Sequence, residues 1–104
     1  MALRMTVQTQ LVVQALLRDP VRELYGLELS QETGLLPGTA YPILLRLENE
    51  GWVTSRWEDI DPQAEKRPPR RYYRLTAAGK RQLAAEQSKW NLLVKTIARV
   101  MRPA

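Results

Sequence analysis

The chain contains neither cysteine nor histidine. Without cysteine there can be no disulfide and no thiolate nucleophile or ligand, which fits a reducing compartment. Without histidine the commonest zinc ligand and the usual proton shuttle at neutral pH are also missing. The sequence therefore predicts a protein that is not an enzyme, with no catalytic residues, no metal site and no cofactor.

Long hydrophobic runs are absent as well. No apolar stretch approaches the roughly 20 residues that span a bilayer, and the N-terminus lacks the apolar core of a signal peptide. We therefore expect a cytoplasmic protein with no membrane partner. The 104 residues, 44% hydrophobic and 26% charged, have the composition of one folded globular domain.

Charge is divided unevenly along the chain. Residues 1–65 carry 5 basic and 10 acidic side chains, whereas residues 66–104 carry 11 basic and 1 acidic side chain, so the two parts have net charges of −5 and +10. A basic half of this kind suits a polyanion as partner, although a basic run can also be simply a solvated surface.

The segment Gly34–Val53 has the pattern of a short amphipathic helix with a start and a stop. We expect Thr39 to be its N-cap, Pro42 to lie in its first turn and Gly51 to end it. The outward face is small and polar, which suits a helix in the DNA major groove, but an ordinary surface helix would show the same pattern. At 100° per residue the packing face holds Ala40, Leu44, Leu47 and Gly51, and the outward face holds Thr39, Pro42, Arg46 and Asn49.

An earlier helix is expected over Thr6–Leu17, which is rich in apolar residues and stops before Pro20. Its apolar face is wide enough to contact both the core and a second surface. Burial in the core alone would explain the same pattern.

Between these two segments, a brief extended stretch at Val21–Tyr25 precedes a helix expected over Gly26–Thr33. We expect Leu27 to point inward, and Glu28, Gln31 and Glu32 to point outward. This helix, a turn containing glycine and the next helix form a helix-turn-helix pattern. Because carboxylates repel phosphates, only the start of the acidic helix is expected near DNA.

Two runs of β-favouring residues, Trp52–Glu58 and Arg70–Leu75, are expected to pair as a hairpin. Residues 59–69 are too many and too rich in proline for a tight turn, so we expect a mobile loop and a hairpin that forms a wing. The outgoing arm suits a strand lying along phosphates, although charge on an edge strand also prevents aggregation. The arm carries five basic residues, Lys66, Arg67, Arg70, Arg71 and Arg74, of which the first four are assigned to DNA.

The last segment, Ala77–Met101, contains no proline and follows a good N-cap residue, Thr76, so we expect one long helix. Its apolar residues recur as a heptad seam broken only by Glu86. A second copy of the chain is the simplest cover for such a stripe, which predicts a two-fold homodimer, with folding back onto the chain's own core as the alternative. The seam residues are Leu83, Trp90, Leu93, Ile97 and Val100.

Several short blocks stand out in this order along the chain. They are Tyr25-Gly26, Gly38-Thr39-Ala40-Tyr41-Pro42 with Leu44, Arg46-Leu47-Glu48 and Gly51, the run from Arg67 to Thr76 with Gly79, and Trp90. Together they resemble the PadR family of bacterial transcriptional regulators, specifically its short subgroup with one C-terminal helix.

The resemblance implies a mainly α protein with a small β-hairpin, in which residues 1–76 form a winged helix-turn-helix and residues 77–104 a C-terminal dimerisation helix. It implies a homodimeric repressor on an inverted-repeat operator in double-stranded DNA. The resemblance implies that Thr39, Tyr41, Pro42 and Arg46 contact the DNA groove and that the wing lies along the DNA backbone. Some relatives stack flat aromatic or cationic compounds on a tryptophan at the position of Trp90. A small aromatic effector there is thus one expectation, and packing in the seam explains Trp90 equally well.

Two features depart from the family pattern. The wing carries an acidic stretch, Glu58–Glu65, and the second helix is acidic, so affinity for DNA is expected to rest more on the basic arm of the wing. The alternative function is a winged-helix protein–protein adaptor that docks a basic partner through its acidic first half and does not bind DNA. Binding to duplex DNA that weakens steeply with salt would distinguish the two.

Overall fold

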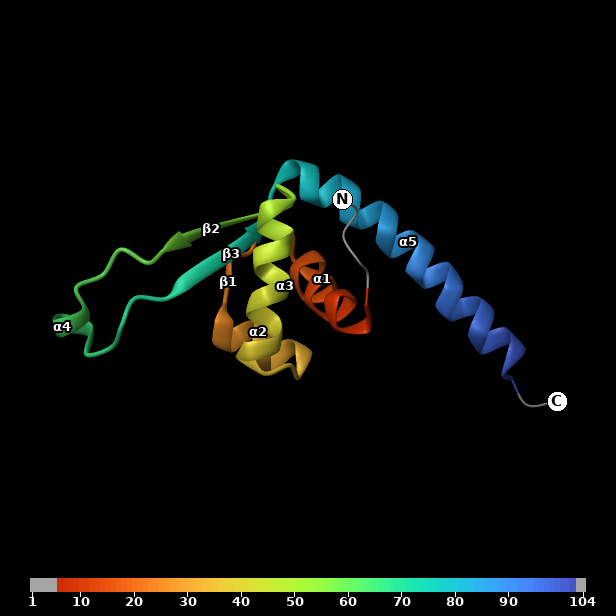
Figure 1. Ribbon diagram of the computed structural model, residues 1–104, viewed down its shortest axis with the longest axis horizontal. Helices are drawn as coiled ribbons and strands as arrows, with labels where there is room; N and C mark the ends of the chain where they lie inside the picture. Colours follow the sequence, from red (N-terminus) through yellow and green to blue (C-terminus); the bar gives the residue numbers. More distant parts are fainter. Residues whose placement is uncertain (1–5, 103–104) are drawn as a thin grey trace.

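The computed structural model describes residues 6–102 and is mainly helical, with one small antiparallel sheet. In Figure 1 a group of helices forms the middle of the molecule, the wing reaches out on one side, and the last helix extends on the other. The molecule is elongated, measuring 61 × 28 × 23 Å. No helix within residues 6–102 is long and apolar enough to cross a membrane. In chain order the elements are α1 (Val7–Arg18), β1 (Leu24–Tyr25), α2 (Gly26–Thr33), α3 (Pro37–Asn49), β2 (Val53–Trp57), α4 (Pro62–Glu65), β3 (Arg71–Leu75) and α5 (Ala77–Val100).

The hydrophobic core lies where α1, α2, α3, the sheet and the first turns of α5 meet. The expected packing face of α3 is confirmed at Ala40, Leu44 and Leu47, which are buried. Gly51 was expected on the same face but is exposed, because it lies beyond the end of the helix. The side chains of the core that are most fully buried come from five elements and are Val12, Val13, Leu16, Leu24, Leu29, Leu44, Leu47 and Leu83.

Helix α2 has the expected bounds, but the expected inward residue is wrong. Leu27 is 58% exposed, and Leu29 is the buried residue of this helix. Two helical positions separate the two side chains by about 200°, so the short helix can bury one of them but not both. Gly34 ends α2 in the left-handed conformation (φ 75°), as a helix-ending glycine does.

The expected start of α3 is also wrong. The helix begins at Pro37, with Leu36 as its N-cap, and the Thr39 N–H already bonds the Leu36 carbonyl at 2.9 Å. Proline suits the first helical position because its φ is preset and its missing N–H has no helical partner there. As a result Pro42 lies inside the helix and not in its first turn. The expected stop is confirmed, since Gly51 is left-handed (φ 78°).

The expected hairpin is confirmed and belongs to a larger sheet with the order β1-β3-β2. In the hairpin, Val53 lies opposite Leu75, Ser55 opposite Tyr73 and Trp57 opposite Arg71. The extended segment before α2 supplies β1, which pairs with the other edge of β3.

The tip of the wing, where a mobile loop was expected, includes one short helix. It contains α4, capped by the Asp61 side chain, which accepts from the Gln63 N–H at 3.0 Å. Below the tip, Arg67 donates two hydrogen bonds to the Glu58 carboxylate, at 2.6 and 3.1 Å. The Arg67 guanidinium lowers the pKa of Glu58 to about 2. This ion pair closes the long connection at its base.

Helix α5 starts as expected, with Thr76 capping the Gly79 N–H at 3.0 Å. A Cβ at Gly79 would lie 1.9 Å from the Trp52 carbonyl oxygen, so the first turn of α5 packs directly on the backbone that enters β2. Leu83 is fully buried in the core of its own chain. This corrects the first position of the expected dimer seam, because Leu83 has no surface left for a partner.

We predict that Gly79→Ala lowers the free energy of unfolding by about 1–3 kcal/mol, because the methyl group would overlap a backbone carbonyl that cannot rotate away. Urea unfolding measures the change. Gly38→Ala is the matched control: nothing lies within 4 Å of its Cβ position, so it should leave stability unchanged or raise it by up to about 1 kcal/mol. Equal unfolding midpoints for the two variants would mean that α5 is not held against Trp52.

We further predict a stability increment that depends on Glu58. Its pKa is lower in the folded chain, about 2, than the ordinary value of 4.5, so the increment is complete above pH 4.5 and is lost as pH falls towards 2. Glu58→Gln should lack this part of the pH dependence in urea unfolding. The control is Asp59→Asn, which removes an exposed carboxylate from the same connection and should keep the profile of the parent.

Candidate nucleic-acid interface

The solvent-facing side of α3 carries the residues expected to contact DNA. Pro42, Arg46 and Asn49 are exposed, Tyr41 is exposed beside them, and Thr39 is half-buried. Arg46 is the only basic residue in α3, and the ion pairs found among the described residues do not involve it. This face can therefore offer one guanidinium, one amide and two hydroxyls to a partner.

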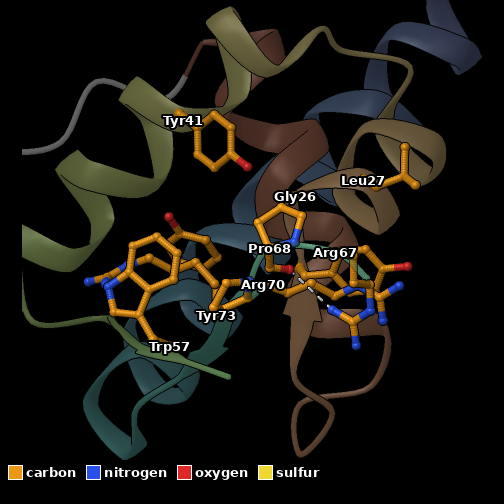
Figure 2. A pocket seen from close by; sticks show the side chains of 11 residues that line it. Gly26, Leu27, Tyr41, Trp57, Arg67, Pro68, Arg70 and Tyr73 are labelled. Carbon is orange, nitrogen blue, oxygen red and sulfur yellow. Dashed lines mark hydrogen bonds between the residues drawn. The ribbon is translucent and has the colours of Figure 1, made fainter. Parts of the chain in front are cut away.

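Tyr41 is held over the start of α2 (Figure 2). A Cβ at Gly26 would lie 2.1 Å from the Tyr41 hydroxyl oxygen, so the absence of a side chain at Gly26 creates the space for that hydroxyl. The Tyr41 ring also lies 6.4 Å from the ring of Tyr73 in β3. Tyr41 thus connects three elements, and Gly26 is a site residue that helix periodicity alone does not indicate.

One face of the β2–β3 hairpin changes from core to surface along its length. Val53 and Leu75 are buried at the helical end, and Trp57 and Arg71 lie opposite each other at the far end. The Trp57 side chain is 61% exposed, although it shares this face with the core residues. Aromatic exposure at this position is the second feature that the sequence pattern did not single out.

A groove of about 490 Å³ separates the start of α2 and Tyr41 from the wing. Tyr41 and Trp57 lie on opposite sides of it in Figure 2, with Tyr73 between them. A second hollow of about 430 Å³ shares Tyr41, Arg71 and Tyr73 with the first and continues along α3 to Leu45. Burial raises the pKa of the Tyr73 hydroxyl, which therefore stays protonated and neutral.

The basic residues assigned to the wing have different surroundings. Lys66 is exposed at the tip, in a left-handed conformation (φ 58°), and Arg67 is paired with Glu58. The Arg70 guanidinium carbon lies 4.3 Å from the centre of the Tyr25 ring. Arg71 donates to Ser55 Oγ at 2.8 Å. The run that looks uniform in sequence is therefore divided between one exposed cation and three that already have intramolecular contacts.

The other face of the hairpin holds a separate ion pair. Arg56 donates to both carboxylate oxygens of Glu23, at 2.7 and 2.9 Å, and lies 5.1 Å from the centre of the Tyr72 ring. The hydrogen bonds from Arg56 lower the pKa of Glu23. This ion pair connects the segment before β1 to the hairpin. It lies on the face of the hairpin opposite Trp57 and Arg71 and so does not occupy the groove.

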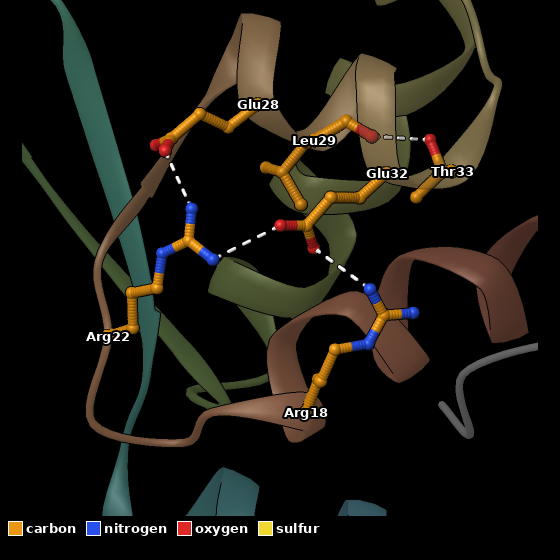
Figure 3. Close-up of polar contacts among 6 residues, drawn as sticks. All are labelled: Arg18, Arg22, Glu28, Leu29, Glu32 and Thr33. Atoms are coloured by element: carbon orange, nitrogen blue, oxygen red, sulfur yellow. Dashed lines mark hydrogen bonds and ion pairs between the residues drawn. The ribbon is translucent and has the colours of Figure 1, made fainter.

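The acidic side chains of α2 are paired within the chain (Figure 3). Arg22 contacts Glu28 at 2.7 Å and Glu32 at 3.1 Å, and Arg18 lies 3.7 Å from Glu32. Glu28 also accepts the Tyr25 backbone N–H at 3.2 Å. The carboxylates that were expected to point outward and to repel phosphates are therefore neighbours of two arginines and are half-buried.

The remaining seam residues of α5 present an apolar surface to solvent. Trp90 is half-buried, Leu93, Ile97 and Val100 are exposed, and Ile97 keeps 48% of its surface accessible. In α1, Val7 and Leu11 are exposed as well, so the face of that helix is wider than the core requires. Within residues 6–102 no group of three or more acidic side chains is placed to hold a metal ion.

Comparison with known proteins agrees with this geometry. Residues 13–85 match the sequence model of the transcriptional regulator PadR-like family. A PadR family transcription regulator from Clostridium difficile is 25% identical, with a TM-score of 0.72 over 92% of this chain and 99% of that one. A PadR-like transcription factor from Bacteroides fragilis is 26% identical, with a TM-score of 0.68 over 89% and 91% of the two chains.

A PadR family regulator from Eggerthella lenta, 24% identical, shares the fold with a TM-score of 0.73 over 94% of this chain and 88% of that one. No curated protein matches the chain by sequence. Because the family match covers more than half of the chain and includes α2, α3 and the wing, the chain belongs to the PadR-like family of transcriptional regulators and has a winged-helix fold.

Proposed function

We propose that this regulator binds an inverted-repeat operator in double-stranded DNA as a homodimer and represses transcription by occupying it. The observation that carries the proposal is the exposed polar face of α3 beside a basic wing. A helix with a small polar face fits the major groove, and cations beside it fit the phosphates. The groove contacts are Thr39, Tyr41, Pro42, Arg46 and Asn49, and the backbone contacts are Lys66, Arg67, Arg70 and Arg71.

The exposed stripe on α5 supports the dimer. Leu93, Ile97 and Val100 lie on one side of a helix, and in Figure 1 no other helix or strand within residues 6–102 lies against its second half. Packing two such stripes together around a two-fold axis would bury them and would present two copies of α3 to one duplex. In this arrangement residues 77–104 form the dimerisation helix, although Leu83 belongs to the body of its own chain.

Trp90 lies at the start of this stripe and is half-buried in the single chain. An aromatic effector that stacks on Trp90 between two α5 helices would change their separation and hence the distance between the two recognition helices. The repressor function implies a cytoplasmic protein, because the operator lies there.

We predict that selection of bound duplexes from a random pool yields an inverted repeat, with half-site centres about 10 base pairs, or a multiple of that, apart. Two copies of α3 related by a two-fold axis would require this symmetry. An adaptor that does not bind DNA would enrich no sequence at all. A single, unrepeated site would show that one chain binds alone.

Ile97→Glu tests whether the chain dimerises through the α5 seam, because a carboxylate in each copy of the seam must be desolvated on dimerisation. The variant should sediment as a monomer and should bind the selected duplex hardly better than a random one. Ser88→Glu adds the same charge on an exposed position away from the seam and should remain a dimer. If both variants form dimers, the dimer interface lies on another surface.

We also predict that Arg46→Ala weakens binding to the selected duplex by roughly 1–3 kcal/mol without loss of folding. Loss of a base contact should relax the preference at one base pair, whereas loss of a phosphate contact should weaken binding to all sequences alike. Arg81→Ala, an exposed arginine of α5, is the matched control. If Arg46→Ala binds with the affinity of the parent, the outward face of α3 is not part of the DNA interface.

A further inference from the structure

The groove between α3 and the wing contains an arginine that is held in place on both sides. Arg71 Nη2 donates to Ser55 Oγ at 2.8 Å, and Ser55 in turn hydrogen-bonds a carboxylate oxygen of Glu48 in α3. The guanidinium carbon lies 5.0 Å from the centre of the Trp57 ring, the neighbour of Arg71 across the hairpin. Because this side chain is already ordered, less conformational entropy is lost when it binds an anion.

The opposite wall of the groove presents a hydroxyl and little charge. Tyr41 reaches over Gly26 from α3, and Tyr73 lies between the walls. The two hollows share Tyr41, Arg71 and Tyr73, so the groove continues directly from the outward face of α3 to the wing. A molecule bound against the outward face of α3 can therefore extend into the groove.

The lining combines aromatic and proline surface with guanidinium groups. The apolar part includes Trp57, Pro68 and Pro69, and Arg71 and Arg70 border it. A sugar–phosphate strand has the matching chemistry, since apolar deoxyribose faces alternate with anionic phosphates, and phosphates are the main contacts of proteins on DNA. A base edge would instead require amide or paired polar groups.

We propose that the groove between α3 and the wing receives one sugar–phosphate strand of the duplex, with Arg71 as its fixed phosphate ligand and Trp57 against the deoxyribose. This inference rests on the proposed binding of DNA and adds where one strand lies. Glu48 and Ser55 act as positioning residues that orient Arg71. In this assignment the wing's contribution depends on a single oriented arginine more than on the number of its cations.

The sheet provides a matched control for Arg71. Arg74 belongs to the same strand, but it lies opposite Thr54 in the register, on the face of the hairpin that carries Arg56. Arg71→Gln and Arg74→Gln remove the same charge from β3 on opposite faces. An effect of net charge alone would be similar for the two variants, whereas a phosphate ligand would distinguish them.

The probe is a mixed-sequence duplex of about 20 base pairs, or two helical turns, with affinity measured over a range of salt concentrations. For Arg71→Gln we expect weaker binding and a slope of log affinity against log salt that is shallower by about 0.9 for each bound chain. Arg74→Gln should keep the slope of the parent. Equal changes in the two slopes, or no change for Arg71→Gln, would overturn the proposal.

Trp57→Leu tests the other half of the proposal. It leaves the number of charges unchanged, so affinity should fall severalfold while the salt slope stays the same, and circular dichroism should show an intact fold. Affinity equal to that of the parent would remove Trp57 from the strand contact. Failure of the random pool to yield an inverted repeat would instead refute the operator proposal, and the Arg71 result on mixed-sequence DNA does not depend on that outcome.

Discussion

Most of the geometry depends on the backbone carbonyl of Trp52. It accepts the Thr76 N–H at 3.0 Å, the Thr76 hydroxyl donates to the Gly51 carbonyl at 2.7 Å, and Gly79 packs on the same peptide. This point therefore joins the end of α3, the start of β2, the end of β3 and the first turn of α5. A small domain with little surplus stability gains from such a junction, because one short segment orients the wing and the last helix together.

Sequence patterns predicted most of the elements where local chemistry decides them, but the expected N-cap of α3 was wrong because Pro37 starts the helix before Thr39. The glycines that end α2 and α3, the Thr76 cap and the alternation in the two strands all depend on neighbours in the chain. The sequence patterns also failed where residues distant in the chain decide which side chain is buried. Leu83 fits a heptad seam by spacing, but it is buried in the core of its own chain. Leu29 is buried and Leu27 is exposed, because α2 can bury only one of the two side chains.

The candidate site shows the same division. The exposure of Arg46 and Asn49 follows from helix periodicity, so the face of α3 could be predicted from its spacing. The surroundings of the wing arginines could not, since their partners Glu58, Tyr25 and Ser55 come from other elements. Likewise, the acidity of α2 looks unfavourable for DNA in sequence, but Arg22 and Arg18 compensate it in three dimensions. A count of charges along a chain therefore overestimates how many are free to meet phosphates.

In the proposed dimer, the position of the uncovered stripe on α5 would have a mechanical consequence. The first turns of α5 are fixed to the body by Gly79 and Leu83, whereas the stripe begins more than a turn later at Trp90. Because the start of the helix is held and a helix is stiff over this length, a change in the packing of two α5 helices would turn each body as a unit. The two copies of α3 would then shift together with their wings. Sensing at Trp90 and contact at α3 would therefore be coupled through rigid elements, without a change inside either winged-helix body.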